Sequence, residues 1–314
     1  METSLRVTLC LTALVLCIRV FAADEVFVTG ENGSGNYKTY AFTSTGTFVN
    51  ETAPPSSLVT TITTSGVNAL VGNYGALKIL THNTSNVNVG TFATISAASM
   101  GTGGVIAVNK IEVDAAGSVY ICPTGFSSNP RTSLRYTSGA VLSQSFTHAN
   151  LVFPSGIDAD ASGNVYIVNS AAVGVGDVIF KFQSNGTFLG TTDINSLGIN
   201  PSDLAIDEAS NVLYLSNESG GTSAIRKFNI AGALPVHVGT ISTPGLSGAV
   251  GLSFDPSTGN LLATAFNGST VEVTSAGSSV HTYAGGTLGS GRDIVRIASQ
   301  SPPVPVELSI FSVE

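Results

Sequence analysis

Alternating apolar and polar positions recur along the chain in short pairs of segments. The pattern is plainest in residues 154–169 (PSGIDADASGNVYIVN), where an alternating stretch leads through an Asp-x-x-Gly-Asn turn into a second, apolar stretch. Similar sequences occupy residues 110–121, 201–217 and 251–262. Because successive side chains of a strand point to opposite faces, each copy predicts two short antiparallel strands joined by a tight turn.

These copies belong to a longer repeat. The residues just past each second strand fall at positions 30, 73, 123, 169, 217 and 265, at intervals of 43, 50, 46, 48 and 48. A second hairpin pattern follows each position, so each of the six units holds four strands. This period predicts an all-β fold, a six-bladed β-propeller of four-stranded antiparallel blades over residues 23–300. A β-helix would show shorter periods, and tandem sandwiches would not show six equal units.

The first unit lacks its opening strand, because its pattern starts at VFVTG (residues 26–30). A spare strand, DIVRI (Asp293–Ile297), follows the sixth unit. We expect this C-terminal strand to pair with the first unit as its innermost strand. Such pairing would close the ring and remove exposed sheet edges.

The first 22 residues predict an export signal. Arg6 ends a short n-region, an apolar run of 12 residues follows (Val7–Ile18), and Val20 and Ala22 suit cleavage after Ala22. The run is too short to span a bilayer, and the alternative is a buried helix of the mature domain. We therefore expect a soluble protein without a membrane span, secreted to the extracellular space or the cell surface. Residues 301–314 form a Pro-rich C-terminal tail.

Charge and cysteine content narrow the function classes. Only 10% of the residues are charged, and 12 Lys and Arg stand against 20 Asp and Glu, for a net charge of −8. A field of this sign repels nucleic acid and anionic membranes, so neither is an expected partner. Cleavage would remove Cys10 and Cys17 and leave Cys122 without a disulfide partner in the chain. That composition favours a large closed fold stabilised by its core.

Sequence patterns of common enzymes are missing, among them G-x-S-x-G, H-E-x-x-H and phosphate-binding loops. The histidines fall in different units and toward the predicted outer strands, so we expect them to form neither a zinc site nor a catalytic dyad. They are His82, His148, His237 and His281.

The segments PSGIDADASGNVYIVN and PSDLAIDEASNVLYLSN resemble NHL-type repeats and, more broadly, the calcium-dependent lactonase propellers of the gluconolactonase and senescence-marker type. The resemblance spans roughly residues 105–285 and implies the propeller fold. In those lactonases a Glu, Asn and Asp set holds one calcium ion, which polarises a lactone carbonyl for attack by water. Asn169 and Asn217 are the positions that the resemblance carries over. The family's Asp-Ser reads Ser216-Asn217 here, which replaces a potential base by an amide, and the chain has no Trp.

Asparagines converge from three predicted blades on the face where the second strands end, here called the loop face. They are Asn73, Asn169 and Asn217, and the nearest carboxylates along the sequence are Asp203 and Glu31. Oxygen ligands of these kinds suit calcium, so the five residues are candidate metal or ligand contacts. The alternative is that the asparagines cap strand ends by bonding backbone groups in tight turns.

Two carboxylates are predicted to line the axis of the ring. Glu112 and Asp158 hold equivalent positions in neighbouring units. Such a pair would bind a cation or raise the pKa of one member, and the alternative is two acids solvated by channel water. Asp158-x-Asp160 also starts like an EF-hand loop, but its twelfth position is Asn169 in place of Glu, which favours a structural hairpin turn.

Asn-x-Ser/Thr sequons mark surface loops and candidate glycosylation sites, at Asn32, Asn50, Asn83, Asn185, Asn217 and Asn267. Together these features favour a secreted, non-enzymatic propeller that binds an extracellular ligand, glycan or protein through its loop face. One alternative is a calcium-dependent lactonase-like hydrolase, and calcium is the one cofactor that the sequence suggests. Another alternative is a self-assembling cell-surface or filament subunit.

Overall fold

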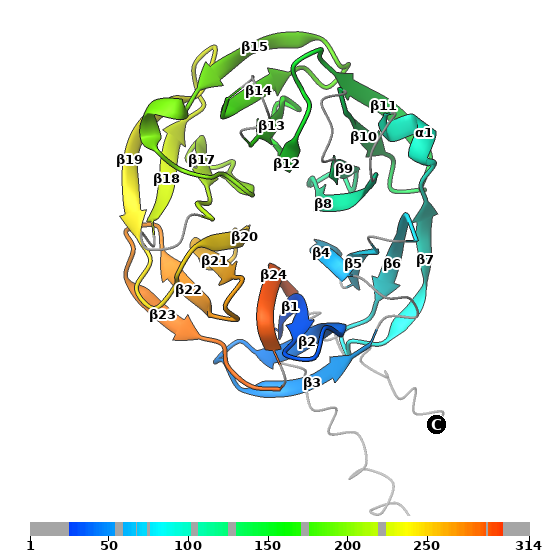
Figure 1. Cartoon of the computed structure of the whole chain (residues 1–314), viewed down its shortest axis with the longest axis vertical. Helices are drawn as coiled ribbons and strands as arrows, with labels where there is room; N and C mark the ends of the chain where they lie inside the picture. Colours follow the sequence, from blue (N-terminus) through cyan, green and yellow to red (C-terminus); the bar gives the residue numbers. More distant parts are fainter. Residues whose placement is uncertain are drawn as a thin grey trace, which may run out of the picture.

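The computed structural model describes residues 25–53, 59–66, 68–73, 76–101, 106–124, 130–170, 176–218, 224–286 and 288–297. Over these ranges the chain forms six four-stranded antiparallel sheets, arranged as blades around a central axis (Figure 1). The predicted six-bladed propeller is therefore confirmed. The predicted export signal and the C-terminal tail lie outside the described residues.

The strands of blade 1 come from both ends of the described chain, and blades 2 to 6 each use four consecutive strands. Blade 1 consists of β24 (Leu288–Ile297), β1 (Glu25–Asn32), β2 (Tyr37–Thr43) and β3 (Phe48–Thr52). Blade 2 consists of β4 (Val59–Ser65), β5 (Asn68–Asn73), β6 (Lys78–His82) and β7 (Asn88–Thr94). Blade 3 consists of β8 (Ala107–Val113), β9 (Val119–Thr124), β10 (Thr132–Tyr136) and β11 (Leu142–Thr147).

The remaining blades follow the same order from the axis outward (Figure 1). Blade 4 consists of β12 (Pro154–Ala159), β13 (Val165–Asn169), β14 (Val178–Phe182) and β15 (Phe188–Asp193). Blade 5 consists of β16 (Leu204–Asp207), β17 (Val212–Leu215), β18 (Ala224–Asn229) and β19 (Val236–Ser242). Blade 6 consists of β20 (Ala249–Asp255), β21 (Asn260–Ala265), β22 (Thr270–Thr274) and β23 (Ser279–Thr282). Two short helices, α1 (Ala97–Met100) and the 3-10 turn η1 (Asn195–Leu197), follow β7 and β15.

The hydrophobic core lies between the faces of neighbouring blades. One cluster joins Tyr166 of β13 to Leu204 and Phe228 of the next blade. The second strands read as apolar runs because both of their faces are covered, and β13 is buried at all five positions. The outer strands are much more exposed, as in β15. The apolar second strand of each sequence repeat is therefore the centre of its blade.

Side-chain hydrogen bonds tie neighbouring inner strands together. Thr60 Oγ1 of blade 2 donates to the backbone oxygen of Val108 in blade 3 (2.8 Å). Ser155 Oγ of blade 4 donates in the same way to the backbone oxygen of Pro201 in blade 5 (3.1 Å). Both residues lie at a bulge, where the register of the inner strand shifts. The bulge directs these hydroxyl groups sideways, so that they connect blades.

Each Asp-x-x-Gly turn is held by its own carboxylate. Asp160 Oδ1 accepts hydrogen bonds from the backbone N–H groups of Ser162 (3.0 Å) and Asn164 (2.9 Å). Its Oδ2 accepts the hydroxyl hydrogen of Tyr166 (3.0 Å). Asp114 is bonded in the same manner in blade 3. The segment that starts like an EF-hand loop is thus a hairpin turn whose Asp is used by the backbone.

The ring closes where β24 pairs antiparallel with β1, as the sequence predicts. The strand begins at Leu288, earlier than the predicted start at Asp293. Its far end also contacts blade 6, because Arg296 Nε lies 2.7 Å from Asp255 Oδ2 and its Nη2 lies 2.6 Å from Glu272 Oε2. The closing strand is therefore fastened both by backbone pairing and by a buried ion-pair network.

This network predicts a large effect of Arg296→Gln on stability. The substitution leaves the buried carboxylates of Asp255 and Glu272 without their cation, which costs about 3–5 kcal/mol when one partner of a buried pair is removed. Urea unfolding followed by circular dichroism measures the change. Lys38→Gln is the matched control, because Lys38 pairs with Glu51 at a partly exposed site and its loss should cost about 1 kcal/mol or less. Equal losses in the two variants would contradict the role assigned to the network.

Candidate functional site

The loop face carries the ends of the second strands, and the asparagine there in blade 4 is fully buried. Asn169 ends β13, and its Oδ1 accepts hydrogen bonds from the backbone N–H groups of Val152 (3.1 Å) and Phe153 (2.7 Å). Its Nδ2 donates to the backbone oxygen of Ser170 (3.2 Å). The side chain thereby fixes the loop that enters blade 4 against the end of the strand.

Asparagines of blades 5 and 2 are used in a similar way. Asn217 Oδ1 accepts a hydrogen bond from the backbone N–H of Asn200 (3.0 Å), and Asn73 Oδ1 accepts one from Ala76 (3.1 Å). Each of the three predicted rim asparagines is at most 1% exposed. The structure brings them to one face, as expected, and their side-chain oxygens accept hydrogen bonds from backbone N–H groups.

A buried ammonium group bridges the axis just inside the loop face. Lys110 Nζ of β8 lies 2.8 Å from Asp203 Oδ2 and 3.3 Å from Asp293 Oδ1. It also donates to the backbone oxygen of Arg292 (3.2 Å). The three charged side chains come from blades 3, 5 and 1, and none is more than 6% exposed. The chain itself therefore supplies a cation at the axis.

The two aspartates of this cluster also bind the neighbouring blades. Asp203 Oδ2 accepts the backbone N–H of Leu252 in blade 6 (2.9 Å), and Asp293 Oδ2 accepts that of Ile62 in blade 2 (3.1 Å). Burial raises the pKa of Asp203 to about 7, with repulsion by Asp293 adding to the rise and Lys110 opposing it. Burial disfavours the charged form of Lys110, but the two carboxylates hold its pKa above the usual value. Asp203 thus belongs to the buried ion-pair cluster that it forms with Lys110 and Asp293 at the axis.

Glu31 occupies a different part of the loop face. It lies next to the end of β1, opposite Tyr37 of β2, and is partly exposed. Of the five predicted rim residues, three are therefore buried strand-end caps, one is an axial ion-pair partner and one is a partly exposed strand residue.

An arginine between two aromatic rings is the most prominent chemical group that the structure describes on the loop face. The guanidinium carbon of Arg292 lies 4.5 Å from the ring centroid of Phe266 and 5.7 Å from that of Tyr37. Arg292 Nη2 also donates to the Tyr37 hydroxyl (3.3 Å). Phe266 is 38% exposed. We call these three residues the loop-face cluster. The sequence analysis did not predict this cluster. The sequence feature that points to it is Arg292, which directly precedes Asp293 in the closing strand.

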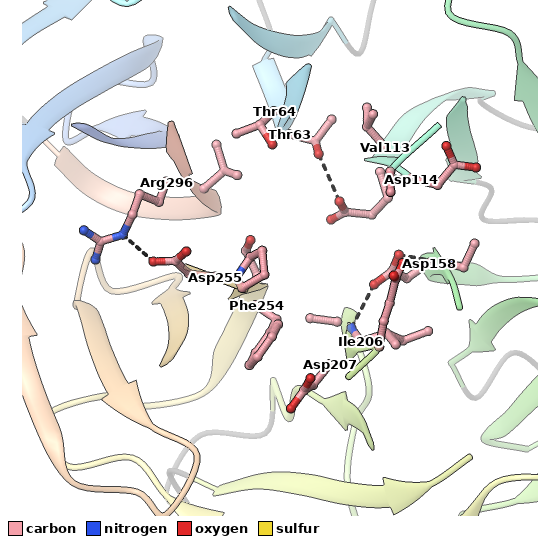
Figure 2. Close-up of a pocket in the computed structure, with 18 of the residues that line it drawn as sticks. Thr63, Thr64, Val113, Asp114, Asp158, Ile206, Asp207, Phe254, Asp255 and Arg296 are labelled. Carbon is pink, nitrogen blue, oxygen red and sulfur yellow. Dashed lines mark hydrogen bonds and ion pairs between the residues drawn. The ribbon is translucent and has the colours of Figure 1, made fainter. Parts of the chain in front are cut away.

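An axial cavity of about 930 Å³ opens on the opposite face, where the Asp-x-x-Gly turns lie (Figure 2). Inner-strand residues of all six blades line it. Both predicted axial acids, Glu112 and Asp158, are among them, so the structure brings the pair to one cavity. Ala205 and Ser253, at the equivalent positions of blades 5 and 6, line the same cavity.

The axial carboxyl groups are hydrogen-bonded and strongly desolvated. Thr63 Oγ1 donates to Glu112 Oε2 (3.0 Å), and the two oxygens of Asp158 accept the backbone N–H groups of Ala159 (2.7 Å) and Ile206 (2.8 Å; Figure 2). Burial is the main cause that raises the pKa of Asp158 to about 8. Burial and repulsion by Asp158 hold the pKa of Glu112 well above its usual range. Burial therefore favours the protonated forms of both carboxyl groups.

The other singled-out side chains lie apart from these features. His82, on the third strand of blade 2, is buried with its Nδ1 3.2 Å from Asn86 Oδ1, and burial lowers its pKa. Cys122 is a buried free thiol whose pKa is raised by burial. The third-strand lysines make the expected contacts between blades, as Lys181 Nζ donates to the backbone oxygen of Gly232 (3.2 Å).

The sequons differ sharply in exposure. Asn185 and Asn267 are exposed, whereas Asn217 is 1% exposed and holds a loop amide. A glycan on Asn217 would require this side chain to leave its buried position. The remaining sequon asparagines, Asn32, Asn50 and Asn83, are partly exposed.

Within the described ranges, no group of three or more His, Cys, Asp or Glu side chains is arranged to hold a metal ion.

The described part of the chain likewise includes no helix with the length and apolar character needed to cross a membrane.

Comparison with solved structures supports the propeller fold. A protein of unknown function from Bacteroides caccae superposes with a TM-score of 0.64 at 13% identity, covering 88% of this chain and 99% of that one. A chain in the crystal structure of a nidogen–laminin complex gives a TM-score of 0.63 at 15% identity, with the same coverage. A putative 6-phosphogluconolactonase from Bacteroides fragilis gives 0.57 at 11% identity, again covering 88% and 99%.

Comparisons of the sequence with protein-family models and with curated proteins find no match. At the identities found among solved structures, the likeness shows the fold alone, because one propeller architecture carries many functions. What the chain binds must therefore be argued from its own side chains.

The protonated axial pair predicts a pH dependence of stability. The pKa of Asp158 is raised to about 8 in the folded chain. This side chain therefore loses its proton at a lower pH in the unfolded chain than in the folded chain. Its contribution to stability is thus fully present below the unfolded pKa and is lost as pH rises toward about 8. In urea unfolding, Asp158→Asn should flatten the fall in unfolding free energy between about pH 5 and about pH 8. An unchanged slope would contradict the assignment.

Proposed function

We propose that the protein is a secreted, non-enzymatic β-propeller that binds an extracellular protein or glycan through its loop face. The observation that carries this proposal is the loop-face cluster, in which Arg292 is stacked against the exposed ring of Phe266 and contacts Tyr37. Tyrosine and arginine are the residue types that most often dominate binding energy at protein interfaces. A rigid aromatic support also lowers the entropy cost of ordering an arginine on binding.

The chemistry of Arg292 points to a partner with an acidic group. The side chain is half-buried, and its Nη2 is held by Tyr37. A partly exposed planar guanidinium suits a carboxylate or sulfate oxygen. Burial raises the pKa of nearby Glu218, although the charges of Arg292 and Lys110 lower it.

The lactonase-like alternative receives less support from the same face. The oxygens of Asn169 and Asn217 are occupied by backbone N–H groups, and Asp203 is paired with Lys110. A metal would have to displace each of these bonds. The charge that a calcium ion would bring is already supplied near the axis by the lysine.

Secretion rests on the sequence of residues 1–22, whose short apolar run between Arg6 and a small-residue cleavage site is typical of an export signal. The low charge content and exposed sequons at Asn185 and Asn267 agree with an extracellular protein. N-terminal sequencing of the protein recovered from culture medium tests this part directly, and we expect Ala23 as the first residue.

Arrays of acidic and neutral glycans, together with purified extracellular-matrix proteins, test the binding proposal. We expect binding to at least one acidic probe, weakened about tenfold or more in Arg292→Gln and in Phe266→Ala, because removal of a central contact costs about 2 kcal/mol. Phe188→Ala is the matched control, since Phe188 is a similarly exposed ring (39%) on the outer strand β15. Binding that is insensitive to both loop-face substitutions, or no binding to any probe, would overturn the proposal.

A further inference from the structure

The axial cavity is a blind pocket rather than a channel. Its floor is formed by Thr63, Glu112, Asp158, Ala205 and Ser253, which hold equivalent positions on five inner strands. The buried axial ion-pair residues Lys110, Asp203 and Asp293 each lie two residues before a residue that lines the cavity, toward the loop face. A volume of about 930 Å³ is at the upper end of the range in which proteins bind small organic ligands.

Two of the carboxylates that line this cavity, those of Asp114 and Asp255, are already used by the protein. Asp114 accepts two backbone N–H groups and the Tyr120 hydroxyl. Asp255 accepts the hydroxyl groups of Ser257 and Thr258 and pairs with Arg296 (Figure 2). These acids build the turns that frame the opening. Their presence therefore says little about the charge of a ligand, and the floor is the informative part.

The floor offers groups that both donate and accept hydrogen bonds. Burial raises the pKa of both Glu112 and Asp158, which favours their protonated forms, and Thr63 and Ser253 add hydroxyl groups. Around them lies apolar wall, including Ala205, Val295 and the ring of Phe254 (Figure 2). Phe254 is held in place by Tyr214, whose ring stacks on it at 6.1 Å between centroids.

We propose that this axial cavity binds a short neutral saccharide. Sugar hydroxyls donate and accept at once, as the carboxyl and hydroxyl groups of the floor do, and the C–H faces of sugar rings suit the apolar wall. An anionic ligand is disfavoured because Arg296, the one cationic residue lining the cavity among the described residues, is committed to Asp255 and Glu272. The site is separate from the loop-face cluster and does not depend on the function proposed for it.

Saturation-transfer difference NMR on the full secreted chain tests this site. The probes are glucose, galactose, mannose, N-acetylglucosamine, maltose, cellobiose and lactose at millimolar concentration. We expect at least one sugar to give transfer. Ala205→Trp, which fills the cavity from blade 5, should abolish that signal, whereas Phe266→Ala on the loop face should leave it unchanged. Asp158→Asn keeps the shape but only one of the two backbone contacts, because an amide nitrogen cannot accept a hydrogen bond. It should raise the dissociation constant about tenfold or more.

Three outcomes would overturn the proposal. The first is that no sugar gives transfer. The second is that transfer survives in folded Ala205→Trp. The third is that calcium or spermidine suppresses the sugar signal at the same concentration as a competing sugar, which would indicate a cation site. If Ala205→Trp fails to fold, as judged by circular dichroism, Ser253→Leu fills the same cavity from blade 6 and replaces it. The substitutions in the cavity are not used in the loop-face array experiment, so failure of one site leaves the other to be judged separately.

Discussion

The antiparallel pairing of β24 with β1 is the constraint on which the rest of the molecule depends, because it joins the two ends of the described chain and turns six sheets into a ring. Every feature discussed above uses a residue of this strand. Arg292 supplies the loop-face cluster, Asp293 the axial ion pairs, Val295 the cavity wall and Arg296 the network that fastens blade 6. If this strand left the ring, the loop face, the axis and the cavity would each lose a side chain. The proposed sites therefore depend on the stability of the whole ring.

The axial ion pairs divide the propeller into two faces that differ in chemistry. On one side Lys110 is held by Asp203 and Asp293, and the described surface beyond it presents an arginine between aromatic rings. On the other side burial raises the pKa of the acids Glu112 and Asp158, and repulsion by Asp158 adds to the rise for Glu112. A buried cation paired with two carboxylates stabilises less than its short distances suggest, since desolvation offsets attraction. Its clearest consequence is geometric, because it fixes three blades at once.

Much of the fold could be predicted from the sequence, since the repeat reflects the buried second strand of each blade and the Asp that caps its turn. The start of β24 was missed because Leu288–Arg292 is rich in glycine; Gly291 is required there, as a Cβ would lie 1.8 Å from Thr264 Oγ1. For the site, the sequence placed the asparagines on one face and the axial acids together. Capping of strand ends by the asparagines was one of the two alternatives that the sequence left open, and in the structure their side-chain oxygens accept backbone N–H groups. The loop-face cluster was out of reach, because Tyr37 and Arg292 are 255 residues apart and meet only after closure.

The most direct test of this account is thermal unfolding of the protein in millimolar calcium and then in chelator. Because Lys110 supplies the cation at the axis and the rim asparagines bind backbone, the account predicts the same unfolding midpoint in both conditions. A site filled at 100 times its dissociation constant would add about 2.7 kcal/mol, a rise of about 5 °C or more in a domain of this size. Such a rise, lost in Asn169→Ala or Asn217→Ala, would contradict the account and establish a calcium site on the loop face.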